Sequence, residues 1–281
     1  MNTWRKGIAQ WRCGKTLYLS VPFTWMMDDA EAVAKQHSGP VVAGGPAVKL
    51  VGAPWAETPN SCPFDVLSMH NPCATFTTRG CIRACRFCAV PRIEGDFREL
   101  QTWKPSPVVC DNNILASSRA HFTKVVDSLT QFEQVDFNQG LDMRLLSDWH
   151  LGELQRLHSV KLRFALDHSR LADVLRDTLI RCRAKGFRDF GVYVLIGFGD
   201  TSADAEQRLE FVRSMGVRPN PMRYQPLDAH AKNEYVAPGW TDYELRRMCR
   251  YYSRLRWLEH VPFKDYLPDD APLFAKEAHD G

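Results

Sequence analysis

Three closely spaced cysteines are the residues of this sequence best suited to do chemistry. The string GCIRACRFC places Cys81, Cys85 and Cys88 in a C-x3-C-x2-C arrangement. Three thiolates this close together can bind three irons of a 4Fe–4S cluster, which leaves the fourth iron open to a further ligand. Tetrahedral zinc would need a fourth protein ligand, which Cys73 or His70 could supply. The spacing therefore favours a reactive iron–sulfur cluster, with a zinc site as the alternative.

The remaining cysteines bear on the same question. The chain has 9 cysteines, and thiols in a reducing compartment stay reduced, so a group of them indicates a metal before disulfides. Cys110, Cys182 and Cys249 lie among apolar neighbours in strand or helix patterns. Free cysteine behaves as a small apolar residue in such places, so we expect these three to be buried and inert.

Composition points to a folded protein. The 281 residues are 44% hydrophobic and 25% charged, which excludes a disordered or low-complexity chain. The formal net charge of +3 neither requires nor excludes a nucleic-acid partner. The longest apolar run, Phe190–Phe198, is far shorter than the ~20 residues of a membrane helix, and the N-terminus lacks the apolar stretch of a signal peptide. We therefore expect a soluble, cytoplasmic protein with no membrane partner.

Strands and helices alternate after residue 72. Short apolar stretches bounded by turn residues predict strands at Ala74–Thr78, Val108–Asp111, Val135–Asn138, Leu162–Asp167, Gly191–Gly197 and Met222–Pro226. Strands that alternate with helices pair in parallel through right-handed crossovers, so the predicted class is α/β, with an open sheet or a partial barrel. In either arrangement the reactive groups belong on loops that follow the carboxyl ends of the strands.

Apolar residues at helical spacing predict the helices between these strands. The expected segments are Ser118–Phe132, Leu151–Leu157, Leu171–Cys182, one helix that opens at Thr201 and one that opens at Thr241. Capping-box patterns support the last two starts, because Asp204 and Glu244 follow the threonines at the required spacing. Gly186 and Gly216 fit helix ends.

The first 72 residues differ from the rest of the chain. They are rich in tryptophan and proline, with a buried-looking strand, Val41–Ala43, that runs into a Gly-Gly-Pro turn. Prolines interrupt the stretch Pro54–Pro72, which we expect to be a loop. The predicted organisation is a short N-terminal α/β extension over residues 1–72, a main domain over 73–240, and a C-terminal helix and tail over 241–281.

The cysteine string resembles a known family. C-x3-C-x2-C with an aromatic residue, here Phe87, before the last cysteine resembles the motif of the radical S-adenosylmethionine (SAM) superfamily. The longer string TTRGCIRACRFCAVPRIEG is similar to the subgroup of tRNA methylthiotransferases and cobalamin-dependent radical enzymes. The resemblance covers roughly residues 73–230. It implies a partial (β/α)6 TIM-like barrel, a 4Fe–4S cluster held by Cys81, Cys85 and Cys88, and a reductant such as flavodoxin or ferredoxin as partner. It also implies reductive cleavage of SAM to methionine and a 5′-deoxyadenosyl radical.

Polar residues at the predicted strand ends extend the resemblance. It implies that Asp111, Asn112 and Asn113 hold the SAM amino group. Asn138, Gln139 and Arg144 are candidates for the ribose and carboxylate, and Asp167 follows the fourth strand. The segment with Leu195 and Gly197 resembles the adenine-binding segment of the family, with Asp200 where glutamate is more usual. Each of these residues has a plainer interpretation as a turn former or helix cap.

Two other function classes stay open. A methylthiotransferase or cobalamin-dependent methyltransferase acting on RNA would need a second cofactor, and Cys13, Cys62 and Cys73 are three upstream cysteines. Residues 39–50 resemble the edge of a cobalamin-binding Rossmann-like domain, but no cobalt-ligating histidine motif is recognisable. We therefore expect a truncated Rossmann-like remnant, no cobalamin and no more than one cluster. A non-catalytic zinc- or iron–sulfur-binding protein is the third class.

The predicted final helix, Asp242–His260, concerns the substrate. It carries five arginines interleaved with aromatic residues, and an apolar stripe on it should pack on the main domain: Leu245, Met248, Cys249, Tyr252 and Leu255. That packing leaves Arg247, Arg250, Arg254 and Tyr251 largely outside. Arginine beside aromatic residues suits phosphate contacts and base stacking, so RNA is one candidate substrate. A solvated arginine face that pairs with local acids is the alternative.

Overall fold

The computed structural model describes residues 4–59, 63–258 and 260–268. The chain divides into two compact units. The first comprises Met1–Leu141, Leu145–Lys161 and Gln225–Lys232, and the second comprises Asp142–Arg144, Leu162–Tyr224 and Asn233–Gly281. Residue 72, where the sequence predicts a domain boundary, lies inside the first unit. Within the part of the chain that is described, no helix is both long and apolar enough to cross a lipid bilayer.

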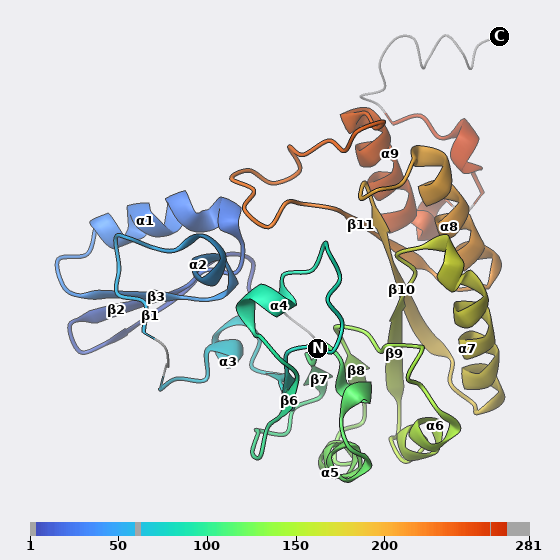
Figure 1. Cartoon of the computed structure of the whole chain (residues 1–281), viewed down its shortest axis with the longest axis horizontal. Coiled ribbons are helices and arrows are strands. Elements are labelled where there is room, and N and C mark those ends of the chain that lie inside the picture. The colour runs from blue at the N-terminus through green and yellow to red at the C-terminus, as the bar shows by residue number, and fades with distance from the viewer. Residues whose placement is uncertain (1–3, 60–62, 259, 269–281) are drawn as a thin grey trace. The chain divides into compact units, whose positions relative to one another are not determined.

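The first unit opens with a three-stranded sheet in the order β1-β2-β3. Its elements are β1 Ala9–Cys13, β2 Thr16–Ser20, the 3-10 turn η1 Thr24–Met26, α1 Met27–Lys35, β3 Val41–Gly44 and α2 Pro46–Val51. Strand β2 pairs antiparallel with β1 and parallel with β3. Ala30 and Ala34, one turn apart on α1, share a buried core with Leu17 and Leu19 of β2. Figure 1 shows α1 running along this sheet. The predicted strand at Val41–Ala43 is confirmed.

The rest of the first unit leads into the main sheet. Its elements are α3 Val66–His70, β4 Ala74–Thr75, β5 Thr78–Arg79, α4 Val90–Ile93, β6 Arg98–Glu99, β7 Val108–Val109, η2 Ile114–Ala116, α5 Arg119–Leu129, β8 Val135–Phe137 and α6 Asp148–Leu154. The stretch predicted as a loop, Pro54–Pro72, contains the short helix α3. Asp65 caps that helix by accepting a hydrogen bond from Ser68 N at 3.2 Å. The prolines of this stretch predicted a loop, whereas the N-cap residue predicts a helix start.

The main sheet has six described strands in the order β11-β10-β9-β8-β7-β4. The later strands are β9 Val160–Ala165, β10 Asp189–Ile196 and β11 Pro219–Arg223. The pairs β4–β7, β7–β8, β8–β9 and β10–β11 are parallel. All six predicted strands are present, and the α/β class is confirmed. The last strand is wrong by three residues at each end, because Pro219 rather than Met222 begins the pairing.

The first predicted strand, Ala74–Thr78, is split in the structure. Ala74 and Thr75 pair with β7, whereas Thr78 belongs to a separate hairpin with β6. The backbone N–H groups of Thr77 and Thr78 donate to Oδ1 of Asp111, at 2.6 and 2.8 Å. The Asp111 side chain thus accepts the two N–H hydrogen bonds that a longer β4 would have donated to a neighbouring strand. The chain therefore leaves the sheet after Thr75.

The second unit carries helices against the later strands. They are η3 Ser169–Leu171, α7 Ala172–Ala184, α8 Ser202–Ser214, α9 Asp242–Ser253, α10 Leu255–Leu258 and η4 Phe263–Asp265. Helix α8 packs against β10, and Arg176 of α7 lies over the Phe211 ring of α8, 5.2 Å from its centre. The capping boxes at Thr201 and Thr241 are formed as predicted. Gly186 and Gly216 end their helices with positive φ angles of 93° and 67°.

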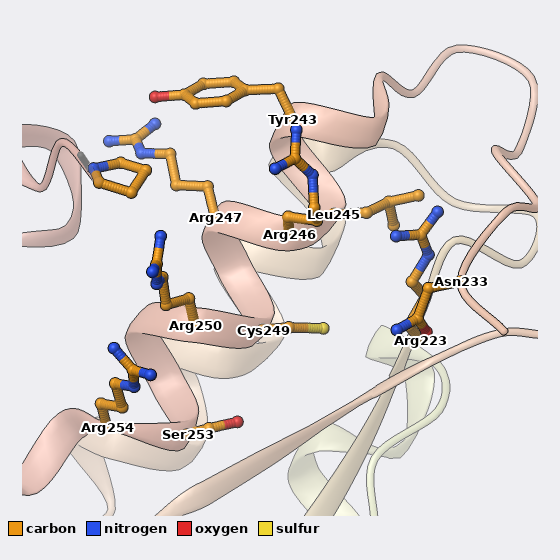
Figure 2. A pocket seen from close by; sticks show the side chains of 11 residues that line it. Arg223, Asn233, Tyr243, Leu245, Arg246, Arg247, Cys249, Arg250, Ser253 and Arg254 are labelled. Carbon is orange, nitrogen blue, oxygen red and sulfur yellow. The ribbon is translucent and has the colours of Figure 1, made fainter. Parts of the chain in front are cut away.

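Helix α9 differs from the predicted final helix. It ends at Ser253 rather than at His260, and α10 follows as a separate short helix. The expected apolar stripe is buried at Leu245, Met248, Tyr252 and Leu255, whereas Cys249 is partly buried. Figure 2 shows Arg247, Arg250 and Arg254 on one side of α9 and Leu245 and Cys249 on the other.

The expectation that Tyr251 lies outside is wrong. Its side chain is fully buried, and its hydroxyl donates to the carbonyl of Val261 at 2.6 Å. Arg247 also holds the following segment, because it donates to the carbonyls of Phe263 and Tyr266 at 2.5 and 2.9 Å. These bonds turn residues after 253 back onto α9, which is why the helix does not continue.

Candidate functional site

The cysteine loop follows β5 in the first unit. The thiols of Cys81, Cys85 and Cys88 are each partly exposed. Sγ of Cys81 accepts hydrogen bonds from Arg83 N at 3.3 Å and from Asn113 Nδ2 at 3.6 Å. These two donors fix the position of the Cys81 sulfur at the start of the loop.

The loop offers three thiols, a donor type that both iron–sulfur clusters and zinc accept. Among the described residues, no three His, Cys, Asp or Glu side chains already converge on one point. His70, one proposed fourth zinc ligand, has its Nε2 2.9 Å from Oγ of Ser20. Burial, together with the charge of Arg5, lowers the pKa of His70.

Glu94 anchors the start of the loop. Its side chain is 6% exposed, and Oε2 accepts from Gly80 N at 2.7 Å and from Asn112 Nδ2 at 2.9 Å. Oε1 pairs with Arg79 at 2.9 Å. One buried carboxylate thus ties the residue before Cys81 to the end of β7. The sequence analysis did not single Glu94 out, although it lies in the string that carries the family resemblance.

The backbone conformation before Cys81 requires glycine at position 80. Its φ angle is +76°, a conformation that residues with a side chain rarely adopt. A Cβ atom there would lie 2.3 Å from the carbonyl oxygen of Asp96 and 2.7 Å from that of Gly95. Both contacts are with backbone, which cannot rotate away. The direction in which the chain enters Cys81 therefore depends on glycine.

Asp111 positions the approach to the loop. It is 3% exposed, Oδ1 accepts from the backbone of Thr77 and Thr78, and Oδ2 accepts from the Thr77 hydroxyl. Burial raises the pKa of Asp111 to about 6, against the opposing effect of these hydrogen bonds. Both carboxylate oxygens are directed at the threonines before the loop. We therefore assign Asp111 a positioning role and do not retain it as a SAM contact.

The other strand-end residues of the first unit lie at the carboxyl ends of β7 and β8. Asn113 is buried and bonded to Cys81, and Asn112 is bonded to Glu94. Asn138 is half-buried directly after β8, and Gln139 is exposed beside it. Because β7 and β8 pair in parallel, their carboxyl ends meet at one edge of the sheet. Phe87, within the loop, is half-buried.

Two predicted site residues of the second unit, Arg144 and Asp167, lie beside groups of opposite charge. Arg144 makes a two-point contact with Asp142, from Nε at 2.7 Å and from Nη2 at 3.1 Å. Asp167 follows β9, and burial raises its pKa against a backbone hydrogen bond from Leu195 and the charges of Arg208 and Arg144. Asp167 is therefore held close to the end of β10.

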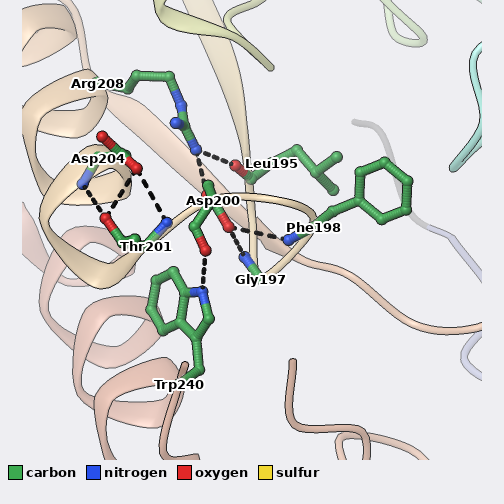
Figure 3. A network of polar contacts seen from close by, with 8 residues as sticks. All are labelled: Leu195, Gly197, Phe198, Asp200, Thr201, Asp204, Arg208 and Trp240. Carbon is green, nitrogen blue, oxygen red and sulfur yellow. Dashed lines mark hydrogen bonds and ion pairs between the residues drawn. The ribbon is translucent and has the colours of Figure 1, made fainter. Parts of the chain in front are cut away.

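The turn after β10 is held by a buried ion pair (Figure 3). Oδ1 of Asp200 accepts from the N–H groups of Gly197 and Phe198, each at 3.0 Å. Nη2 of Arg208 lies 2.5 Å from Oδ2 of Asp200 and 2.8 Å from the carbonyl oxygen of Leu195. The side chains of Arg208 and Asp200 are 5% and 8% exposed. The carboxylate of Asp200 is thereby fully committed to shaping the turn.

Gly197 has a structural explanation that the sequence did not reveal. Its φ angle is +77°, and a Cβ atom there would lie 3.1 Å from Cδ2 of Leu245 on α9. The glycine was predicted to let adenine approach the backbone. In the structure, the space that its missing side chain would fill is bordered by Leu245, so turn geometry and helix packing account for the residue.

Of the three cysteines expected to be buried, the expectation is confirmed for two and wrong for Cys249, which is partly buried. Cys110 and Cys182 are buried, and burial raises their pKa values to about 12 and about 11. Neither thiol is ionised at neutral pH, so both are inert. Cys13 is exposed on β1 and Cys73 is partly buried. Cys62 lies outside the described residues.

Comparisons with known proteins leave the chain unassigned. No protein-family model matches its sequence, and no curated protein matches it either. Its function must therefore be argued from its own residues.

Proposed function

We propose that this protein is a radical SAM enzyme that abstracts hydrogen from a substrate not yet identified. The observation that carries the proposal is the cysteine loop: three partly exposed thiols within eight residues, the first of them accepting two N–H···S hydrogen bonds. Buried structural cysteines, such as Cys182, have neither the exposure nor these donors. A ligand loop of this kind suits a cluster that reacts with a bound molecule.

The order of the strands supports the same proposal. The six described strands of the main sheet follow one another in space as they do in the chain. Right-handed crossovers between parallel strands in sequence order place successive helices on the same face of the sheet. This is the winding of a (β/α) barrel, and we propose that the sheet is the wall of a partial (β/α)6 barrel. In such a barrel, the loops at the carboxyl ends of the strands carry the chemistry.

The residues of the chain have distinct parts in this account. A bound 4Fe–4S cluster with SAM supplies one-electron cleavage of SAM to methionine and a 5′-deoxyadenosyl radical. Cys81, Cys85 and Cys88 hold the irons, while Asn113 and the backbone of Arg83 donate to Cys81.

Other residues orient SAM or the loop. Glu94 and Asp111 fix the chain before the first cysteine. We assign Asn112, Asn138 and Gln139 to SAM contacts. Contacts of Arg144, Asp167 and Leu195 with SAM stay predictions from the sequence resemblance, and a reductant such as flavodoxin or ferredoxin would deliver the electron.

Cluster reconstitution under anaerobic conditions tests the proposal. We expect about four irons per chain, as in a single 4Fe–4S cluster, and an electron paramagnetic resonance spectrum that changes when SAM is added. Cys85→Ala should lose both properties, whereas Cys182→Ala, a cysteine buried in α7, should keep them. Iron that stays in a Cys81→Ala/Cys85→Ala/Cys88→Ala variant, or one zinc per chain with no response to SAM, would contradict the proposal.

A further inference from the structure

Helix α9 borders two hollows in the second unit that the proposed radical chemistry does not use. The first has a volume of about 500 Å³, which lies within the range of small-molecule sites. The second has a volume of about 440 Å³. They share Arg250, Arg254 and Pro268, so the two hollows adjoin along the same helix. Figure 2 shows the first of them with its lining side chains.

The first hollow is strongly basic. Its described lining includes five arginines and no acidic residue: Arg223, Arg246, Arg247, Arg250 and Arg254. Asp242, which lies beside the hollow, pairs with both Arg223 at 2.9 Å and Arg246 at 2.7 Å. Among the described residues, this one carboxylate is shared by two of the five guanidinium groups. Arginine is the side chain best matched to phosphate oxygens, which it can bind at two points.

Two buried polar groups at the same hollow have no partner. Arg223 has a side chain that is only 5% exposed, and its Nε donor is unsatisfied among the described residues. The hydroxyl of Tyr243 is likewise buried without a hydrogen-bond partner there. Unsatisfied buried groups are uncommon in folded proteins and call for an explanation. Two such groups lining one basic hollow point to a ligand.

Arg247 is held by backbone groups of the protein itself. Arg247 donates to three carbonyl groups, those of Phe263, Lys264 and Tyr266, and its guanidinium lies 4.3 Å from the centre of the Phe263 ring. It is therefore committed to the wall of the hollow. Arg254 is exposed, and Arg250 is half-buried one turn before it, so these two are placed to reach a bound molecule from both hollows.

The second hollow differs in character. Beside the two shared arginines, it is lined by Trp257, Leu258, Tyr266, Leu267 and Pro268. The Trp257 side chain is 66% exposed, which is unusual for so large an apolar residue. A flat aromatic face beside arginines suits the stacking of a base whose phosphates contact the arginines.

We propose that the two hollows together bind a nucleotide, with its phosphates at Arg250 and Arg254 and its base against Trp257. The first hollow supplies the charge, and the second supplies the apolar surface. This site is independent of the cysteine loop, since all its residues belong to α9, α10, β11 and the segments that follow them in the second unit.

Calorimetry with three probes tests the site: ADP, inorganic pyrophosphate and adenosine. We expect ADP to bind more tightly than pyrophosphate, adenosine to bind weakly, and ADP affinity to fall with salt. Arg250→Ala/Arg254→Ala should weaken ADP and pyrophosphate by about tenfold or more, because charge-assisted hydrogen bonds are lost. Trp257→Ala should weaken ADP alone, by about fivefold or more.

Arg256→Ala is the matched control. Arg256 is an exposed arginine two residues from Arg254 that lines neither hollow, so its loss should leave ADP binding unchanged. Adenosine binding as tight as ADP binding, or an effect of Arg256→Ala equal to that of Arg250→Ala/Arg254→Ala, would overturn the proposal. So would binding of a labelled single-stranded RNA without binding of ADP, which would favour RNA as the occupant.

The same preparations separate this site from the proposed function. Thermal melts check that each variant is folded. SAM cleavage should be unchanged in Arg250→Ala/Arg254→Ala, because neither residue belongs to the unit that carries the cysteine loop. Loss of ADP binding with SAM cleavage intact supports the site. ADP binding that persists in a variant without a cluster would show that the nucleotide site exists even if the proposed radical chemistry is wrong.

Discussion

Asn113 donates a hydrogen bond from Nδ2 to Sγ of Cys81, 3.6 Å away, although 32 residues separate them in the chain. The contact joins the end of β7 to the first cysteine of the loop. It places a neutral donor on a sulfur that we propose binds iron. Hydrogen bonds of this type raise the reduction potential of a cluster, because they stabilise added negative charge.

Removal of that donor should make the cluster harder to reduce. Asn113→Ala keeps all three cysteines, so we expect it to bind iron but to show a more negative reduction potential than the wild type. A redox titration followed by electron paramagnetic resonance measures the difference. An unchanged potential would mean that the Asn113 side chain does not contact a cluster sulfur.

Gly80 should tolerate no side chain. Gly80→Ala forces a Cβ atom to within 2.3 Å of the Asp96 carbonyl oxygen, so we expect loss of reconstituted iron and a lowered melting temperature. Gly95→Ala is the matched control, because φ there is +72° but nothing lies within 4 Å of the added atom. It should cost only the left-handed backbone penalty of about 1–2 kcal/mol and keep the iron. Equal effects of the two substitutions would contradict the role of Gly80.

Asp111 should make stability fall as pH rises. Its pKa is raised from 3.8 to about 6 in the folded protein, so between these values the folded state holds a proton that the unfolded state has lost. Stability is therefore lost as pH rises from about 4 to about 6, by up to about 3 kcal/mol at 1.36 kcal/mol per pKa unit.

Asp111→Asn isolates this effect. The amide oxygen can accept from Thr77 N and Thr78 N, and the amide nitrogen can donate to the Thr77 hydroxyl, so the hydrogen-bond geometry is kept. Urea unfolding at several pH values should show a smaller loss of stability between pH 4 and pH 6 for the variant than for the wild type. Parallel curves for the two proteins would show that Asp111 does not titrate in this range.

The ion pair between Asp200 and Arg208 should be costly to break. Arg208→Ala leaves a buried carboxylate without its partner, and we expect a loss of about 3–5 kcal/mol in unfolding free energy. Arg176→Ala serves for comparison, because the Arg176–Asp173 pair is 45% and 83% exposed and should contribute no more than about 1 kcal/mol. Denaturant unfolding of both variants gives the two values. A loss below about 1 kcal/mol for Arg208→Ala would contradict the role of this ion pair in holding the turn.

The parts of the fold that were predicted correctly depend on local sequence patterns. The strand positions and the capping boxes at Thr201 and Thr241 follow from patterns within a few residues, which the sequence shows directly. The residues that were missed act over longer separations. Glu94 bonds Gly80 and Asn112, 14 and 18 residues away, and Asp111 reaches back 34 residues to Thr77. Periodicity carries no information about such contacts.

Tyr251 shows the same limit on the helix itself. The spacing of apolar residues correctly selected Leu245 and Met248 for burial, but it left Tyr251 outside. Its burial depends on the segment after Ser253, which folds back so that Val261 accepts the tyrosine hydroxyl. A side chain covered by a later segment cannot be identified from the pattern of its own helix.

Release of 5′-deoxyadenosine tests the central claim most directly. Reconstituted protein, reduced without oxygen and mixed with SAM, should form 5′-deoxyadenosine and methionine slowly even without a substrate. Cys81→Ala, Cys85→Ala and Cys88→Ala should each leave SAM intact, whereas Cys110→Ala should still cleave it in whatever fraction remains folded. No 5′-deoxyadenosine from wild-type protein that carries a reduced 4Fe–4S cluster, or equal release from the three cysteine variants, would contradict the account.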